Sequence, residues 1–241
     1  EQPDFLAEAL GLLPSQLHGY YESYDVAAAL QILGYFPQLP TQFIPRLLEL
    51  ALGESKSYRL QAQQLLQRLP DIRLRAEEGL ASSKQEIRIV AAEWLVRLND
   101  VAAIAALQTA LKKEKREVVI AALLTALEKL GEDISAHLSP EHLLKDAEKG
   151  LKAKLPTSLK WLLDQSFPAL TWQDGSAVSE TILRWWVVLA HKLKDPVGNA
   201  LFQRYLSLLS LDSQQQLGEF LFAGFAHQDV RSPSQEEALA E

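Results

Sequence analysis

Apolar residues recur every three or four positions along most of the chain, which is the spacing of one face of an α-helix. The stretch 87–98 is a clear case, and its apolar stripe consists of Ile87, Ala91, Trp94, Leu95 and Leu98. The alternation of apolar and polar residues that is typical of a half-buried strand is nearly absent from the first half of the chain. The pattern therefore predicts an all-α protein.

The same helical pattern returns at intervals of about 30 residues in the first half of the sequence. Four segments superpose after shifts of 33, 29 and 32 residues, and they span 25–37, 58–70, 87–100 and 119–131. The second shift places Arg59 on Arg88 and also aligns an arginine near the segment end with Arg97. Further helical patterns follow the first three segments, at 41–52, 71–81 and 100–111. A fixed period of this length predicts a stack of about four helix pairs.

Several residues indicate where these helices begin and end. Asn99 and Gly131 adopt a left-handed backbone easily, and they predict helix C-termini. Asp71 and Asp100 occupy equivalent places, where a carboxylate can accept hydrogen bonds from the free N–H groups of the following helix. Ser83, three residues before a glutamate, has the spacing of a capping box. We expect helix boundaries at these positions.

The third segment resembles the second helix of a HEAT repeat. It opens with a branched apolar residue followed by Arg88, and a pair of small residues, Ala91 and Ala92, lies one turn later. The fourth segment departs from this pattern, because Ile120 stands where the arginine is expected. The resemblance covers about half the chain. It implies a HEAT-like helical-repeat superhelix (an α-α superhelix) over residues 1–134, and it is specific for fold rather than activity.

We expect residues 135–230 to form a helical extension packed on the repeats. A serine, a proline and a glutamate at 139–141 combine a hydroxyl cap, a proline in the first turn and an early acid, which together predict a helix start. Helices are predicted up to residue 154 and then over 157–163, 180–194, 198–209 and 213–226. The stretch 167–178 interrupts them, and its Asp174-Gly175 pair predicts a tight turn in a small hairpin. Residues 231–241 are predicted to be a flexible tail.

The second half also resembles a region of a large bacterial family. The residues that carry this resemblance are 155–162, 168–176, 183–186, 191–196 and 205–206, within a similarity over about residues 85–230. Members of the family contain a domain of unknown function, often alongside a WGR domain, and the named member is the molybdate metabolism regulator. The resemblance implies that the chain is an internal helical segment of a longer bacterial protein, and it supplies no catalytic residues. The absence of methionine agrees with such a segment.

The composition removes several classes of chemistry. The chain has no cysteine, which excludes disulfides, thiolate nucleophiles and cysteine-ligated zinc or iron–sulfur sites. Apolar runs such as 118–124 and 185–190 are far shorter than the roughly 20 residues that a bilayer-spanning helix needs. No signal peptide is visible at the N-terminus. We therefore expect a cytoplasmic protein that does not contact a membrane.

Charge is distributed unevenly along the chain. The formal net charge is −7, with −5 in residues 1–53, −5 in residues 195–241 and +3 between them. A nucleic-acid-binding domain normally concentrates more positive charge than this middle segment, because its cations replace the counterions of the phosphates. The charge therefore leaves nucleic acid open as a partner but does not favour it.

No pattern of residues predicts a catalytic, cofactor or metal site. Only two of the five histidines, His137 and His142, are close in sequence, and a Ser-Pro break separates them. Adjacent carboxylates such as Glu77 and Glu78 diverge on a helix and lack the apolar enclosure that raises a catalytic pKa. Glycine-rich nucleotide-binding motifs and nucleophile elbows are absent from the sequence. We expect a non-enzymatic protein without cofactors.

Seven residues are candidates for an interaction surface: Arg59, Arg88, Arg97, Lys149, Lys152, Lys154 and Trp172. The arginines recur at repeat-equivalent places and would line one surface, or they would join neighbouring repeats through hydrogen bonds and ion pairs. The lysines would meet phosphates or an acidic partner, or they would form the solvated face of a helix. The tryptophan would be an exposed functional aromatic beside the predicted turn, or it would pack that turn onto the helices.

Stacked helix pairs usually present a concave surface, formed by successive second helices, to a protein or peptide. We therefore predict a protein-interaction scaffold inside a larger bacterial protein, with a regulatory role as the family name implies. Its partner would be a protein, a peptide or another domain of the full-length chain. Two alternatives stay open. One is a nucleic-acid-binding module resembling HEAT-like DNA repair glycosylases, and the other is a domain that positions an activity located elsewhere in the chain.

Overall fold

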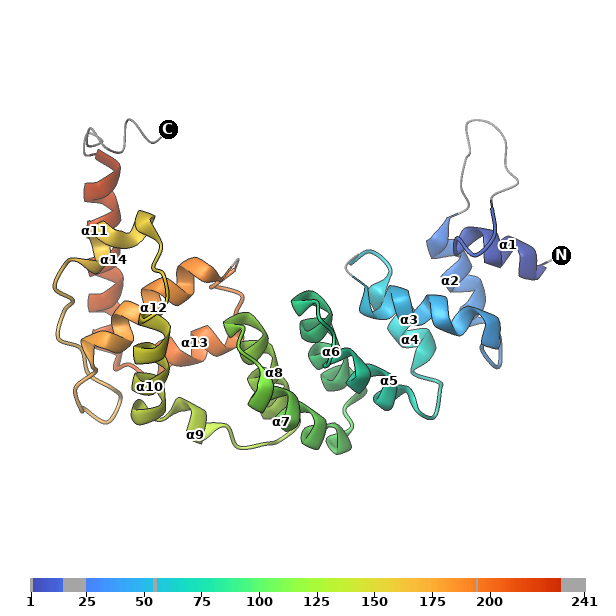
Figure 1. Cartoon of the computed structure of the whole chain (residues 1–241), viewed down its shortest axis with the longest axis horizontal. Helices are drawn as coiled ribbons and strands as arrows, with labels where there is room; N and C mark the ends of the chain where they lie inside the picture. Colours follow the sequence, from blue (N-terminus) through green and yellow to red (C-terminus); the bar gives the residue numbers. More distant parts are fainter. Residues whose placement is uncertain (1, 15–24, 54–55, 194, 231–241) are drawn as a thin grey trace. The chain divides into compact units, whose positions relative to one another are not determined.

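The structure is a computed structural model that describes residues 2–14, 25–53, 56–193 and 195–230 of the 241-residue chain. Within these residues it contains fourteen α-helices, three short 3-10 helices and no strand beyond isolated β-bridges (Figure 1). The prediction of an all-α protein is confirmed. The predicted tail, 231–241, lies outside the described residues.

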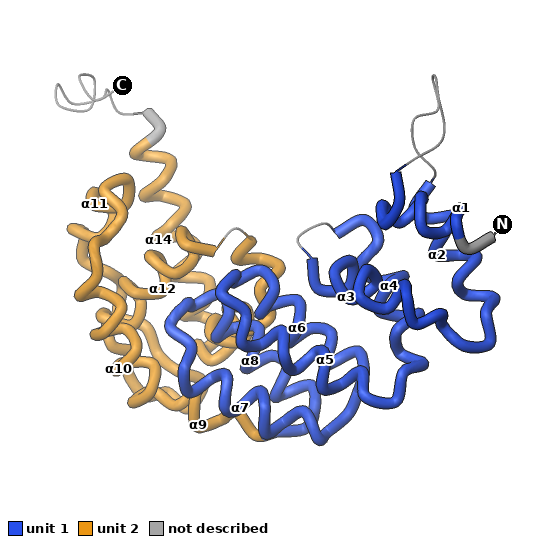
Figure 2. The backbone as a smooth tube through the Cα atoms, turned by 45° about the vertical axis from the view of Figure 1, so that its right-hand side comes forward, with its two compact units in different colours: residues 1–132 blue, residues 133–241 orange. Residues whose placement is uncertain are grey.

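The chain divides into two compact units, residues 1–132 and residues 133–241 (Figure 2). The domain boundary predicted after residue 134 lies close to this division. Each unit has its own buried aromatic residues: Trp94 is 1% exposed in the first unit, and Trp186 is 3% exposed in the second. The packing of the second unit on the first stays a prediction.

The described helices of unit 1 lie close to the predicted helical segments, with α1 before them, but the main contacts do not join the predicted pairs. They are α1 (Gln2–Ala9), α2 (Val26–Gly34), α3 (Ile44–Leu52), α4 (Arg59–Leu66), α5 (Ile72–Gly79), α6 (Gln85–Leu98), α7 (Ile104–Lys113) and α8 (Glu117–Lys129). The shifts found in the sequence relate α2, α4, α6 and α8, and α3, α5 and α7 lie between them in the chain. Each of these intervening helices packs on the helix that follows it, so that α3 contacts α4, α5 contacts α6 and α7 contacts α8.

Residues related by the repeat occupy equivalent places in the core of unit 1. Leu33, Leu66, Leu95 and Leu127 are separated by 33, 29 and 32 residues, and all are buried. The alanines at 29, 62 and 91, one turn earlier, are also buried, and a leucine replaces them in the fourth helix. The small side chains let neighbouring helices approach closely, while the leucines fill the space between them. The repeat in the sequence is therefore a repeat in core packing.

The predicted helix ends are confirmed in part. Asn99 and Gly131 have φ values of 52° and 94°, and Asp100 accepts a hydrogen bond from the Ala102 N–H at 3.0 Å. Asp71 caps nothing with its side chain, because its backbone (φ −103°, ψ 21°) lacks the extended conformation of an N-cap residue. The capping box predicted at Ser83 is also wrong, because α6 begins one residue too late for it.

Unit 2 contains the remaining described helices. They are α9 (Ser135–Leu138), α10 (Pro140–Leu151), α11 (Lys160–Leu163), α12 (Glu180–Lys192), α13 (Ala200–Ser207) and α14 (Leu211–Val230). The helix start predicted at 139–141 is confirmed, since Ser139 Oγ accepts a hydrogen bond from the His142 N–H at 3.3 Å. The first helix ends at Leu151, slightly before the predicted end at residue 154, and the later helices lie close to their predicted positions.

The segment between α11 and α12 contains the predicted tight turn. An antiparallel β-bridge pairs Thr171 with Ala177, and Gly175, with φ of 83°, allows the chain to reverse between them. A second bridge pairs Trp172 with Leu209, just before α14. The second bridge, together with the hydrogen bond from the Thr171 N–H to Ser213 Oγ, ties the irregular segment to the end of α13 and the start of α14.

The contact between α10 and α12 requires a glycine. A Cβ atom at Gly150 would lie about 2.5 Å from the ring of Trp185, well inside the closest normal approach. Trp185 is itself 4% exposed, so its ring has little room to move. A Cβ atom at Gly218, in the middle of α14, would have no neighbour within 4 Å. The two glycines therefore differ sharply in what surrounds them, although both are helical and belong to unit 2.

We predict that Gly150→Ala lowers the free energy of unfolding of unit 2 by about 1–3 kcal/mol, because the added methyl group overpacks the α10–α12 interface. Gly218→Ala is the matched control. It should raise the free energy of unfolding by about 0.5–1 kcal/mol, because alanine favours the helix and meets no neighbour. Urea unfolding followed by tryptophan fluorescence measures both, since four of the five tryptophans lie in unit 2. Equal effects of the two substitutions would contradict the close approach.

Candidate functional site

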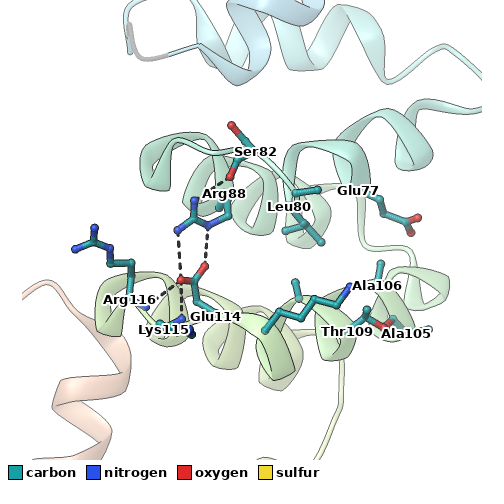
Figure 3. A pocket seen from close by; sticks show the side chains of 13 residues that line it. Glu77, Leu80, Ser82, Arg88, Ala105, Ala106, Thr109, Glu114, Lys115 and Arg116 are labelled. Atoms are coloured by element: carbon teal, nitrogen blue, oxygen red, sulfur yellow. Dashed lines mark hydrogen bonds and ion pairs between the residues drawn. The ribbon is translucent and has the colours of Figure 1, made fainter. Parts of the chain in front are cut away.

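A groove with a volume of about 780 Å³ lies between α5 and α7 in unit 1 (Figure 3). Binding pockets for small ligands typically measure about 300–1,000 Å³, so this groove is large enough for several side chains of a partner. We call it the α5–α7 groove, and it is lined by Glu77, Leu80, Ala81, Ser82, Arg88, Ala105, Ala106, Thr109, Ala110, Lys113, Glu114, Lys115 and Arg116.

Small residues form the middle of the α5–α7 groove. Ala106 and Ala110 lie one turn apart on α7, and Ala105 and Thr109 follow the same spacing beside them. Leu80 approaches from the end of α5 and is almost fully buried. Short side chains on α7 leave the space that longer ones would fill, so the hollow follows directly from the alanine-rich sequence of this helix.

A partly buried ion pair forms one end of the groove. Arg88 Nε and Nη2 donate to the two carboxylate oxygens of Glu114 at 2.7 and 3.3 Å, a two-pronged contact. The side chains of Arg88 and Glu114 are only 15% and 8% exposed. Arg88 Nη1 also donates to the carbonyl oxygens of Ser82 and Ser83 at 2.8 and 3.2 Å. One guanidinium therefore joins the α5–α6 loop to the α7–α8 loop.

Glu114 in turn organises the start of α8. Its Oε1 accepts hydrogen bonds from the backbone N–H groups of Lys115 and Arg116 at 2.8 and 2.9 Å. Burial by itself raises the pKa of Glu114, but the hydrogen bonds from Arg88 and from these two N–H groups outweigh burial, and the pKa lies below its usual value. The carboxylate is therefore held in its charged form, and it fixes the backbone from which two basic side chains project.

Three basic residues belong to the segment where α7 ends and α8 begins, next to Glu114 in the chain. Lys113, Lys115 and Arg116 are exposed, and none of them forms an ion pair with another described residue. Figure 3 shows Lys115 and Arg116 on the side of the Arg88–Glu114 pair, with Glu77 at the opposite end. The α5–α7 groove therefore has a positive end, a small-residue middle and an acidic residue at its far end.

The candidate arginines mostly join elements of unit 1. Arg59 Nη2 donates to the carbonyl oxygen of Gly53 at 2.7 Å, and Arg88 makes the same contact with the residue six positions earlier. Arg97 Nε donates to Gln63 Oε1 at 3.0 Å, and the amide of this buried glutamine donates to the Ala51 carbonyl oxygen. These contacts fit the alternative in which the arginines join repeats. Only Arg88 lines the groove.

The other candidates belong to unit 2 and do not line the groove. Lys149, Lys152 and Lys154 are exposed at and beyond the end of α10. Trp172 is only 6% exposed, and its ring meets the ring of Trp186 edge-on with centroids 5.9 Å apart. It is therefore a buried residue and not an exposed aromatic, because the bridge to Leu209 holds the turn against the helices.

Two histidines that the sequence separates are brought together. The rings of His137 and His142 meet edge-on with centroids 5.0 Å apart, because the chain turns between α9 and α10. Burial, and secondly the charge of His142, lowers the pKa of His137. His142 Nε2 lies 3.3 Å from Asp146 Oδ2. Even so, the part of the chain that the structure describes contains no group of three or more metal-ligating side chains placed to hold an ion.

The candidates predicted from the sequence included Arg88 but not Lys113, Lys115 and Arg116. The signal was present, since four of the five residues 112–116 are basic. The sequence does not reveal that the charge of Glu114, within this run, is neutralised by Arg88, which lies 26 residues earlier in the chain. Nor does it reveal that the run borders a hollow rather than an ordinary solvated loop.

Comparisons with protein-family models, with curated proteins and with solved structures gave no match to this chain. Among the described helices, none combines the length and the apolar character that crossing a membrane requires. The site is therefore interpreted from its own geometry and charge.

We predict that Arg88→Met lowers the free energy of unfolding by about 3 kcal/mol, because it leaves the carboxylate of Glu114 buried without its counter-charge. The double substitution R88M/E114Q should recover part of this loss, since a neutral amide can still accept from the N–H groups at the start of α8. Urea unfolding followed by far-ultraviolet circular dichroism measures both effects.

Arg75→Met is the matched control for Arg88→Met. The side chains of Arg75 and Glu78 are 58% and 65% exposed, and breaking a solvated pair of this kind costs less than about 1 kcal/mol. If the two substitutions destabilised the protein equally, the Arg88–Glu114 pair would have no special role.

The lowered pKa of Glu114 predicts a pH dependence of stability. Its stabilising contribution is fully present above the pKa of a glutamate in the unfolded chain, about 4.3, and is lost as the pH falls through the lower pKa of the folded state. The difference in unfolding free energy between the wild type and Glu114→Gln should therefore shrink as the pH is lowered from about 6 to about 3. A difference that stays constant over this range would contradict the lowered pKa.

Proposed function

We propose that this chain is a non-enzymatic, HEAT-like interaction scaffold within a larger bacterial protein, and that it binds a segment of a protein partner in the α5–α7 groove. The observation that carries the proposal is the hollow between two intervening helices of successive repeats, with its small-residue middle and its positive end. Peptides commonly bind to helical proteins in grooves of this kind, where an apolar floor supplies affinity and nearby charges fix orientation.

The regular packing of unit 1 supports the HEAT-like part of the proposal. Buried leucines recur at the repeat spacing, and the contacts of Arg59 and Arg88 with carbonyl groups six residues earlier are equivalent. In such a stack the intervening helices face the same way, so the surfaces of α5 and α7 are neighbours although their first residues are 32 positions apart in the chain. A scaffold role needs nothing more than this surface.

Nucleic acid is the second candidate partner, and the observation that favours it is the basic run beside the groove. The run supplies Lys113, Lys115 and Arg116, which could meet phosphates. The groove lining contains no aromatic residue on which a base could stack, and Glu77 lies at its far end. These features support a protein segment over a nucleic acid strand.

A library of random dodecapeptides displayed on phage tests the proposal. Selection against the wild-type chain should enrich peptides that lose binding to Ala105→Trp, since Ala105 is exposed and a tryptophan there fills the groove. Ala223→Trp is the matched control, because this alanine is also exposed and helical but lies on α14. The enriched peptides should bind this control as they bind the wild type.

Two outcomes would contradict the proposed function. One is the failure of the library to yield any peptide that binds the folded chain. The other is enrichment of peptides that bind Ala105→Trp as tightly as the wild type, which would place their site outside the α5–α7 groove. Fluorescence anisotropy of the synthetic peptides gives the dissociation constants for both comparisons.

A further inference from the structure

The charges along the α5–α7 groove are not balanced. Its lining holds four basic and two acidic residues. Glu114 is neutralised by Arg88, and Glu77 is paired with Arg73, which lies one turn earlier on α5. The charges of Lys113, Lys115 and Arg116 remain, and all three lie where α7 ends and α8 begins. The unbalanced positive charge therefore comes from residues at the junction of α7 and α8.

The dipole of α7 has little effect on this distribution of charge. The C-terminal end of a helix carries a partial negative charge, and Lys112 and Lys113 lie in that last turn, where they offset it. The remaining basic residues, Lys115 and Arg116, lie beyond the helix in a loop that Glu114 holds by its backbone N–H groups. Their side chains are free to contact a ligand while their backbone stays in place, which lowers the entropic cost of binding.

The middle of the groove suits an apolar segment. Ala105, Ala106 and Ala110 offer methyl groups and no polar side-chain atom, so a charged group bound there would lose its hydration without compensation. Thr109 supplies the one hydroxyl group of this stretch of α7. A ligand that matches the groove therefore carries negative charge at one end only and small or apolar side chains along the rest.

A nucleic acid strand matches this arrangement poorly. Its phosphates recur at every nucleotide, so some of them would lie over the alanines and near Glu77. The binding of single strands also relies on aromatic side chains that stack on bases, and the groove lining offers none. A peptide, in contrast, can place acidic residues at one end and apolar residues at the other.

We infer that the α5–α7 groove binds a peptide segment with acidic residues at one end, held by Lys113, Lys115 and Arg116, and small or apolar residues along the alanines of α7. The inference rests on the proposed function and specifies its partner. It also places the acidic end of the bound segment at the junction of α7 and α8, where the backbone of these three basic residues lies.

The test uses the peptides selected from the random dodecapeptide library against the wild-type chain. Peptides that Ala105→Trp blocks should be enriched in aspartate and glutamate at one end. The triple variant K113Q/K115Q/R116Q should weaken their binding by about tenfold, and replacing their acids with glutamine or asparagine should have a similar effect. Raising the salt concentration should weaken binding to the wild type and leave binding to the triple variant nearly unchanged.

A second triple variant, K149Q/K152Q/K154Q, is the matched control. It removes the same number of positive charges from residues of unit 2 that do not line the groove, and it should leave peptide binding unchanged. If both triple variants lost peptide affinity equally, the effect would come from net charge alone, and the inference would be overturned. Labelled single-stranded and duplex oligonucleotides form a further arm. Tighter binding of these probes than of the acidic peptides, lost in K113Q/K115Q/R116Q, would also overturn it.

The outcomes separate this inference from the proposed function. If selected peptides are blocked by Ala105→Trp but show no excess of acids and no response to K113Q/K115Q/R116Q, the groove binds peptides and the acidic partner is wrong. If Ala105→Trp blocks no selected peptide, the proposed function itself fails.

Discussion

Hydrogen bonds from arginine side chains to backbone carbonyl groups hold the loops of unit 1 in place. The last carbonyl groups of a helix have no partner within the helix, so they need donors from elsewhere. Arg46 donates to the Leu10 carbonyl oxygen at 2.8 Å, and Arg68 donates to those of Gly34 and Phe36 at 3.0 Å. Because a guanidinium carries several donors in a fixed plane, one side chain can satisfy two carbonyl groups at once. In unit 2, Arg184 has the same role at the end of α11.

The groove depends on this constraint at one position. Arg88 donates hydrogen bonds from one nitrogen to the carbonyl groups of the α5–α6 loop and from the others to Glu114. A single side chain therefore holds the α5–α6 and α7–α8 loops at that end of the groove. The alanines of α7 supply the space, and the arginine holds the two loops at one end of that space at a set separation. Neither feature alone would make a binding site, because alanines on an unsupported helix would allow the neighbouring helices to close over them.

Much of the fold could be predicted from the sequence, because helix periodicity and the repeat are local patterns. The leucines at 33, 66, 95 and 127 could be aligned before their burial was known. The N-caps were less predictable, since Asp71 and Asp100 look equivalent and only Asp100 has an extended backbone. The candidate site could be predicted least. The pairing of Arg88 with Glu114 depends on how two loops meet, and local patterns carry no information about that.

The placement of the groove between successive repeats has a consequence for how unit 1 responds to force. The helices α5 and α7 pack mainly against α6 and α8, so each follows its own partner when neighbouring repeats flex. A segment bound along both helices would contact two neighbouring repeats at once and restrict their motion relative to each other. Its binding free energy would then oppose separation of the two repeats, and occupancy of the groove would set the stiffness of the stack between them.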